Sequence, residues 1–319
     1  MIEAPVSESG VYEIEMSLYQ MDQCCAAPSL NASVVDLLID ECPRVAWQSH
    51  PRLNPDFEPE YKPHFDIGSA AHLIQLEPEL FSDQTVAIDA NDWKTDWAQR
   101  ERNQARRDGK VPLLLRDWKM IRDMNSALMQ NEAIAQAFRD GKSERSVFSI
   151  DPATGIWRRC RPDKVAYHGG WLLDYKAMES ANPREFGQQA WRFKWHRRAA
   201  WYLDTFRQAT GAEPKDYWFV VQSKKKPYLA TINSLDFVDL DKGRRDCERA
   251  CEIFAECLSR GTDSSAWPGY RTAAAPDRDT AFRSSLPAFA HQAIDAQHQA
   301  WSDAKVAAAR ALANTPLEQ

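Results

Sequence analysis

The spacing of apolar residues changes along the chain and separates expected helices from expected strands. Residues 34–39 repeat apolar positions at helical spacing just after the capping residue Asn31, which predicts a short helix. Residues 68–76 predict a second helix that ends before Pro78. The Pro-rich stretch between them, residues 43–63, predicts a loop.

From residue 146 the pattern becomes typical of strands joined by tight turns. Asp151-Pro-Ala-Thr-Gly155 has Pro early and Gly late, as turns do, and predicts a first hairpin. His168-Gly-Gly170 predicts a second hairpin. Residues 217–222 are almost continuously apolar, as in a strand that is buried on both faces. The expected strands are residues 146–150, 156–160, 165–167, 171–175, 217–222 and 228–232.

Helices are expected beside these strands, over residues 187–209 as one long helix and over residues 239–260. The order of helices, hairpins, helix, strands and helix indicates a mixed α/β architecture around one central sheet. Residues 1–27 show no period and are expected to be irregular. Residues 28–271 are expected to form the main domain, and residues 272–319 an Ala-rich helical tail.

The composition is that of an ordinary globular protein, with 319 residues, 44% hydrophobic and 27% charged. No run of about 18 apolar residues occurs, so we expect no membrane partner. The formal charge of −6 argues against a protein that coats nucleic acid, but not against an enzyme with a local basic groove. The seven cysteines follow no secretory signal, which predicts free thiols in a reducing cytoplasm.

The main chemical signal is Asp163 followed, after a short gap, by the triplet Asp174-Tyr175-Lys176. Residues i and i+2 of a strand face the same side, so Asp174 and Lys176 should project together, and a hairpin would bring Asp163 beside them. Two converging carboxylates repel unless a cation lies between them, and hard oxygen ligands suit Mg²⁺, with Mn²⁺ as a substitute. Lys176 would then orient a water or offset charge during phosphodiester hydrolysis.

This pattern resembles the PD-(D/E)xK nuclease signature, whose restriction-endonuclease-like core is a central mixed sheet flanked by helices. Upstream, Gly68-Ser-Ala-Ala-His72 resembles the G-x-x-x-H element of RecB-like nucleases, in which a helix presents a residue to the metal. Further motifs follow in the order expected of the RecE (exonuclease VIII) family of phage and prophage exodeoxyribonucleases. These motifs are residues 28–38, 76–78, Glu144, residues 151–155, 199–202 and 267–270.

The resemblance implies a Mg²⁺-dependent exonuclease on linear double-stranded DNA that resects the 5′-ended strand for a single-strand annealing protein. It also implies a ring-shaped homo-oligomer, such as a tetramer, that threads DNA ends. The implied metal ligands are His72, Asp163, Asp174 and the backbone carbonyl of Tyr175, and Lys176 is the implied catalytic lysine beside the two aspartates. Two alternatives stay open, a non-catalytic DNA-binding or assembly module and an endonuclease of the same superfamily.

One element departs from the family pattern. The family has Gln-Ala-Ala-x-Tyr after the catalytic strand, and the matching stretch is Arg198-Ala-Ala-Trp-Tyr202. Arg198 and Tyr202 lie four residues apart, on one face of the expected helix, and are candidates for DNA contact. Arg197 and Lys194 are further candidates for phosphate contact, with a solvated helix face as the alternative for this basic stretch.

Three cysteines, Cys247, Cys251 and Cys257, lie on the last expected helix. Some RecB-like nucleases hold an iron–sulfur cluster with four cysteines, but this spacing offers no clear fourth partner. We therefore expect no iron–sulfur cluster, and expect these side chains to pack as small hydrophobic groups.

Overall fold

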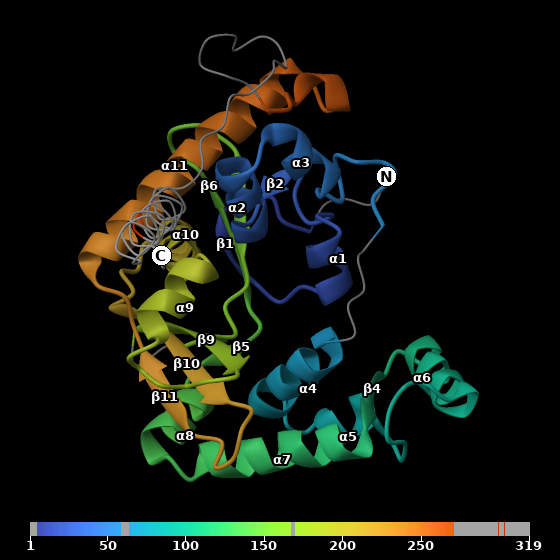
Figure 1. Ribbon diagram of the computed structural model, residues 1–319. Coiled ribbons are helices and arrows are strands. Elements are labelled where there is room, and N and C mark those ends of the chain that lie inside the picture. Colours follow the sequence, from blue (N-terminus) through green and yellow to red (C-terminus); the bar gives the residue numbers. More distant parts are fainter. Residues whose placement is uncertain (1–4, 59–63, 167–169, 271–298, 300–302, 304–319) are drawn as a thin grey trace, which may run out of the picture. The chain divides into compact units, whose positions relative to one another are not determined.

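The computed structural model describes residues 5–58, 64–166 and 170–270, together with Gln299 and Asp303. Residues up to Gly269 group into one unit, which holds all the elements named below (Figure 1). Apart from those two positions, the tail expected over residues 272–319 lies outside the described residues. None of the described helices is long and apolar enough to cross a membrane.

A five-stranded mixed sheet carries the candidate site, in the strand order β11-β10-β9-β8-β5. Its strands are β5 (Lys142–Ser143), β8 (Lys164–Val165), β9 (Trp171–Met178), β10 (Asp216–Ser223) and β11 (Ala230–Asn233). β9 and β10 run parallel, and the other neighbours are antiparallel. The pairing of β8 with β9 confirms the second predicted hairpin, although its turn residues 167–169 lie outside the described part.

Helices cover both faces of β9 and β10, which explains why most residues of these two strands are apolar (Figure 1). One face packs on α9 (Phe186–Arg192) and α10 (Trp195–Thr210). The other face packs on α7 (Leu115–Met129) and α8 (Glu132–Arg139). The α/β class with a mixed sheet flanked by helices is therefore confirmed.

The first predicted hairpin lies in a different sheet, so the expectation of one central sheet was wrong. This second sheet has the order β1-β6-β7-β2. Its strands are β1 (Gly10–Tyr12), β2 (Ser29–Leu30), β6 (Ser146–Ile150) and β7 (Trp157–Cys160). The chain passes from β7 to β8 through Arg161-Pro162-Asp163, and Pro162 has no N–H to continue the ladder. Asp163 therefore lies where the chain changes sheets.

The N-terminal segment is more regular than its sequence predicted. It contains β1, which pairs with β6, and the short helix α1 (Met16–Gln20). The Tyr12 and Tyr19 rings contact the ring of Phe148 on β6, with centroids 6.0 and 6.3 Å apart. The segment lacks a sequence period because its order comes from pairing with residues more than a hundred positions away.

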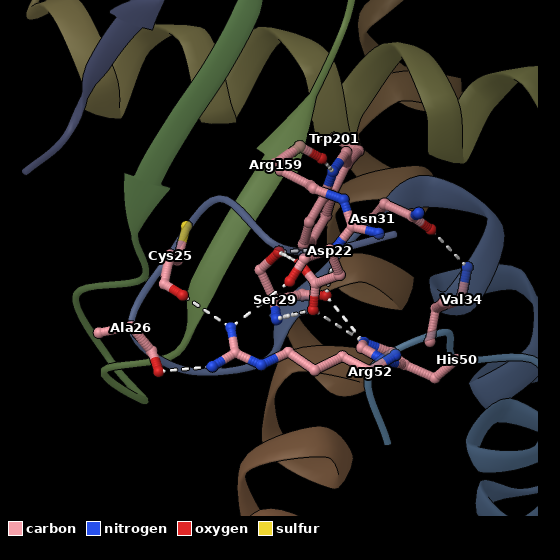
Figure 2. A network of polar contacts seen from close by, with 10 residues as sticks. All are labelled: Asp22, Cys25, Ala26, Ser29, Asn31, Val34, His50, Arg52, Arg159 and Trp201. Carbon is pink, nitrogen blue, oxygen red and sulfur yellow. Dashed lines mark hydrogen bonds and ion pairs between the residues drawn. The ribbon is translucent and has the colours of Figure 1, made fainter. Parts of the chain in front are cut away.

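A buried polar network joins this segment to β7 (Figure 2). The fully buried carboxylate of Asp22 accepts hydrogen bonds from the backbone N–H of Ser29, at 2.9 Å, and from Arg159 Nη1, at 2.5 Å. Arg159 Nη1 also donates to the carbonyl oxygen of Ser29, at 2.8 Å. His50 Nδ1 accepts the N–H of Arg52, so the proton of the neutral ring lies on Nε2, which faces Asp22 and Ser29. The network fixes β7, and β7 leads directly into Asp163.

The remaining elements lie outside these two sheets. The predicted helix after Asn31 is confirmed, and Asn31 Oδ1 caps it by accepting the N–H of Val34 at 3.0 Å. The predicted loop over residues 43–63 begins with a helix, α3. These elements are α2 (Ala32–Asp40), α3 (Pro43–Gln48), α4 (His64–Leu76), α5 (Phe81–Gln84), β3 (Thr85–Ile88), α6 (Asp96–Arg107), β4 (Val111–Leu114) and α11 (Phe237–Arg260), and β3 and β4 form a parallel pair.

The single helix expected over residues 187–209 was wrong, because the chain breaks between α9 and α10. Lys194 adopts a left-handed backbone with φ of +58°, which ends the first helix and redirects the second. The redirected Trp195 stacks on Phe219 of β10, with ring centroids 5.1 Å apart. Tertiary packing therefore overrides the local helical pattern at a position without Gly or Pro.

Candidate active site

Four of the predicted site residues come together from three separate segments. His72 lies on α4, Asp163 lies between β7 and β8, and Asp174 and Lys176 lie on β9. His72 Nδ1 is 3.3 Å from Asp163 Oδ2, and Lys176 Nζ contacts Asp174 Oδ2 directly. The side chain of Asp174 is 2% exposed and that of Lys176 19%, so this ion pair is largely shielded from water.

Asp163 is held in its ionised form by several partners. Its Oδ2 accepts the backbone N–H of Tyr175 at 2.5 Å and faces His72. Burial opposes the charge, but His72, Lys176 and this N–H outweigh it and lower the pKa of the Asp163 carboxyl. Conversely, burial disfavours the His72 cation, but the Asp163 carboxylate outweighs burial and raises the pKa of His72. The ring of His72 also rests on the edge of Tyr175, with centroids 5.3 Å apart.

The register of the parallel strands places Asp174 and Lys176 on the face that α10 covers. Asp174 is opposite Phe219, whose side chain packs in the same core cluster as Trp195 and Trp201 of α10. Tyr175 points to the other face, where its hydroxyl donates to Gln222 Oε1 at 2.6 Å. The alternation predicted for the D-x-K triplet is therefore present.

The carbonyl of Tyr175 lies at the edge of β9 that faces Asp163. The N–H and C=O of one strand residue point to the same edge, and the Tyr175 N–H points to Asp163. β8 pairs with β9 only at Leu172 and Leu173, so it does not cover this carbonyl. The backbone oxygen that the resemblance implied as a ligand is thus on the same side as the Asp163 carboxylate.

The donor atoms of these groups are of the type that a hard divalent cation prefers, but they are not already arranged around a common point. Within the described part of the chain, no three His, Cys, Asp or Glu side chains lie close enough together to hold a metal ion. The Asp163 and Asp174 carboxylates are instead paired with His72 and Lys176. Two buried carboxylates with a nearby carbonyl oxygen and imidazole are the donors that Mg²⁺ and Mn²⁺ accept.

Arg198 faces this site from α10. It is half-buried, and its Nη1 donates to the hydroxyl of Tyr202 at 3.3 Å, so the two residues share one helix face as predicted. Burial opposes its charge, but Tyr202 and the carboxylates of Asp174 and Asp163 raise the pKa of the guanidinium. No carboxylate lies within 4 Å of Arg198 in the described ranges, which leaves its charge available to an anionic ligand.

Arg197 and Lys194 do not reach this site. Arg197 points toward α2 and α11, where it donates to Asp36, to both carboxylate oxygens of Asp40 and to Asp246. Lys194 Nζ lies 3.6 Å from the same Asp40. These ion pairs occupy the Arg197 charge, so we assign it to the packing of three helices and not to DNA.

Glu144 is a site residue to which the sequence analysis gave no role. Its backbone is left-handed, with φ of +51°, and its N–H donates to the carbonyl of Asp163 at 3.1 Å. Arg161 Nε donates to its carboxylate at 2.9 Å. Burial and the negative charge of Asp163 raise the pKa of Glu144 to about 7, although Arg161 opposes this shift. In the sequence, the only indication of a role for Glu144 was its place among the motifs that follow the RecE-like order.

Tyr217 is a second such residue. It lies on β10 two positions before Phe219, so it is diagonal to Asp174 on the same face of the sheet. Its side chain is 1% exposed, and its hydroxyl has no hydrogen-bond partner in the described structure. The Tyr217 ring packs edge-on against Tyr202, with centroids 5.6 Å apart. No feature of the sequence singled it out, because its position depends on strand register.

The cysteines of α11 lie in the hydrophobic core. Cys247, Cys251 and Cys257 are 1–2% exposed and belong to the cluster that also holds Phe254. None of the seven cysteines forms a disulfide, and all are buried. The three side chains therefore pack as small hydrophobic groups, as predicted.

Comparison by sequence identifies one family. The family described as "PDDEXK-like domain of unknown function" (DUF3799) matches residues 38–270. This range contains the Asp163, Asp174 and Lys176 cluster and most of the fold. No protein with curated function matches the chain.

Comparison by structure supports the same fold. A crystal structure from Eubacterium rectale, provisionally assigned as an exonuclease, matches with a TM-score of 0.54 and 14% identity, over 75% of this chain and 85% of that chain. An alkaline exonuclease from Laribacter hongkongensis, LHK-Exo, matches with a TM-score of 0.26 and 12% identity, over 62% of this chain and 96% of that chain. The second similarity is too weak to carry an argument, and the first shows a shared fold.

Proposed function

Because the chain belongs to the DUF3799 family of PDDEXK-like domains, we propose that it is a metal-dependent exodeoxyribonuclease. Its substrate is linear double-stranded DNA, and it resects the 5′-ended strand from the end. The observation that carries the proposal is the meeting of His72, Asp163, Asp174 and Lys176 from three separate segments. A chance D-x-K triplet would not bring Asp163 and a histidine of a distant helix to the same point.

The protein groups divide the chemistry as follows. His72, Asp163, Asp174 and the Tyr175 carbonyl would hold Mg²⁺, or Mn²⁺ in its place. When bound, the ion polarises the phosphodiester and lowers the pKa of a water. The Lys176 ammonium lies beside Asp174, where it can orient the attacking water or offset negative charge as the phosphate reacts.

Arg198 supplies a contact for the phosphate backbone. It is half-buried, it faces the catalytic carboxylates, and its charge has no carboxylate partner within 4 Å in the described ranges. Tyr202 is only 7% exposed, so its part is to hold the Arg198 guanidinium through its hydroxyl. The amide found at this position in RecE-like enzymes both donates and accepts, whereas the guanidinium donates and carries a fixed charge.

The proposal extends to partners and location. The RecE-like order of motifs supports a ring-shaped homo-oligomer, such as a tetramer, at DNA ends, together with a single-strand annealing protein that takes the 3′ overhang. Seven buried cysteines without a disulfide support the cytoplasm as location. Light scattering on the purified full chain tests the oligomer, and a single-subunit mass would refute the ring.

The decisive test uses linear duplex DNA labelled at either the 5′ or the 3′ end, with Mg²⁺, beside a covalently closed circle. Early release of the 5′ label and an intact circle are expected. Cleavage of the circle would indicate an endonuclease, and uncut linear DNA that is still bound would indicate a non-catalytic module.

The matched variants are Asp174→Ala, which removes a proposed ligand, and Glu252→Ala, which removes an exposed carboxylate of α11. Asp174→Ala should fold, as judged by circular dichroism, and lose hydrolysis, whereas Glu252→Ala should keep it. Robust cleavage by folded Asp174→Ala would remove the site from the reaction.

A further inference from the structure

A groove opens directly beyond the catalytic lysine, at the end of β9. It has a volume of about 540 Å³ and is lined by β9 residues from Ala177 onward, by one side of α9 and by Lys224. A strand advances about 3.3 Å per residue, so Met178 lies about 7 Å past Lys176 along β9. A second hollow of about 560 Å³ adjoins it, shares Glu179 and Ser180 with it, and continues to the turn between β10 and β11.

The walls of these two hollows carry more positive than negative charge. Arg192, Lys224, Lys225 and Lys226 line them, against the two carboxylates of Glu179 and Glu185. Glu179 is already paired, with Lys224 at 2.7 Å and Lys225 at 3.3 Å. Arg192 is exposed and has no carboxylate within 4 Å in the described segments. The remaining positive charge favours an anionic ligand.

An exposed aromatic ring stands in the same wall. Phe193 is 42% exposed, which is high for so apolar a side chain, and it lines the groove. Trp195 supports one side of its ring at a centroid distance of 5.7 Å and an angle of 25°. The Arg192 guanidinium lies 5.3 Å from the centre of the Phe193 ring. A nucleobase could stack on the Phe193 ring beside the guanidinium or in its place. An aromatic ring beside a cation is the usual platform for an unstacked base.

We propose that this groove binds single-stranded DNA next to the scissile phosphate. A base inside a duplex is stacked on its neighbours and cannot lie on Phe193, whereas a separated strand can place a base there and phosphates near Arg192 and Lys224. The inference rests on the proposed nuclease function for its biological meaning, because the groove continues from the catalytic lysine. The binding itself can be measured without any hydrolysis.

The test measures fluorescence anisotropy of a labelled oligo-dT, with EDTA present, at several salt concentrations. The variant is Arg192→Ala with Phe193→Ala. The matched control is Arg100→Ala with Trp97→Ala, which removes an exposed cation and an exposed aromatic ring from α6. We expect at least a tenfold loss of affinity in the groove variant, since one stacked base and one phosphate contact are removed, and no loss in the control.

Blunt duplex of the same length provides the comparison for strand specificity, and its affinity should fall less. Because Phe193 packs on Trp195, the single variant Arg192→Glu serves as a second test that leaves this packing in place. Unchanged affinity for oligo-dT in both variants, or an equal loss for duplex, would overturn the inference. Cleavage of duplex by a wild type that binds no single strand would refute the groove and leave the nuclease standing. A wild type that binds oligo-dT and cleaves no duplex would support the groove and refute the nuclease.

Discussion

Two adjacent arginines of α10 should behave in opposite ways when each is changed to glutamine. Consecutive helical residues point about 100° apart, so Arg197 faces α2 and α11 while Arg198 faces the carboxylates of the candidate site. We expect Arg197→Gln to lower the stability of the protein without a specific effect on DNA. We expect Arg198→Gln to weaken DNA binding with little change in stability.

The size of the stability loss follows from the contacts of Arg197. Its guanidinium makes hydrogen bonds of 2.5 to 3.3 Å to Asp36, Asp40 and Asp246, and its side chain is 7% exposed. Removing one partner of a buried ion pair costs about 3–5 kcal/mol. The three carboxylates are 32 to 36% exposed, so water compensates in part and the lower end applies. A loss of about 3 kcal/mol corresponds to a melting temperature lower by about 6–12 °C.

Urea denaturation of both variants measures the stability term, and duplex binding in EDTA at several salt concentrations measures the DNA term. Neutralising one phosphate contributes a slope of about 0.9 in log K against log salt, so Arg198→Gln should flatten the slope by about one unit. Arg197→Gln, measured well below its melting temperature, should keep the wild-type slope. Equal slopes for wild type and Arg198→Gln, or a flattened slope for Arg197→Gln, would refute this division of roles.

Other changes test the site and its supports. Lys176→Ala should keep metal affinity, measured by calorimetry, and lose hydrolysis, because the ammonium acts on water and phosphate; joint loss would make Lys176 part of metal binding. Tyr217→Phe should raise the free energy of unfolding by about 1 kcal/mol in urea, because it removes a buried hydroxyl without a partner in the described structure; a decrease would reveal a partner such as Asp174. Burial and Arg159 lower the pKa of His50 despite Asp22, so the unfolded chain takes up this proton first as the pH falls. The free energy of unfolding that the neutral His50 ring contributes above pH 6.5 should therefore be lost as the pH falls below that value. The urea midpoint of His50→Gln should decline less than that of the wild type between about pH 7 and 5.

The two hairpins and the strands that carry the candidate site could be predicted from sequence because their signals are local. The Asp151–Gly155 turn and the alternation of Asp174 and Lys176 follow from turn chemistry and the period of two. The buried strand β10 follows from its apolar run. Asp163 could be placed beside them because the second hairpin is short. The tight Asp163 contact with the Tyr175 N–H then follows from the change of sheet at Pro162.

The remaining features depend on partners far away in sequence. Arg197 and Arg198 are identical neighbours, and their different roles come from carboxylates on α2 and α11 that no local pattern reveals. Lys194 breaks the expected helix although it is neither Gly nor Pro, because Trp195 must reach Phe219. Sequence patterns record local preference, and these positions are set by packing that overrides it.

The balance of charge explains why the described residues hold no ready metal cage. Arg161 pairs with Glu144 and Lys176 pairs with Asp174, and the charge of Arg198 acts on Asp163 and Asp174 from more than 4 Å away, so buried negative charge is compensated before any ligand arrives. In the proposed reaction a divalent ion adds positive charge beside the carboxylates, and a DNA phosphate adds negative charge beside Arg198. The ion alone would leave an excess of two positive charges in a largely dry site, and one phosphodiester, with a single negative charge, would reduce that excess to one. Because the metal ion and the phosphate carry opposite charges, we expect each to raise the affinity of the site for the other.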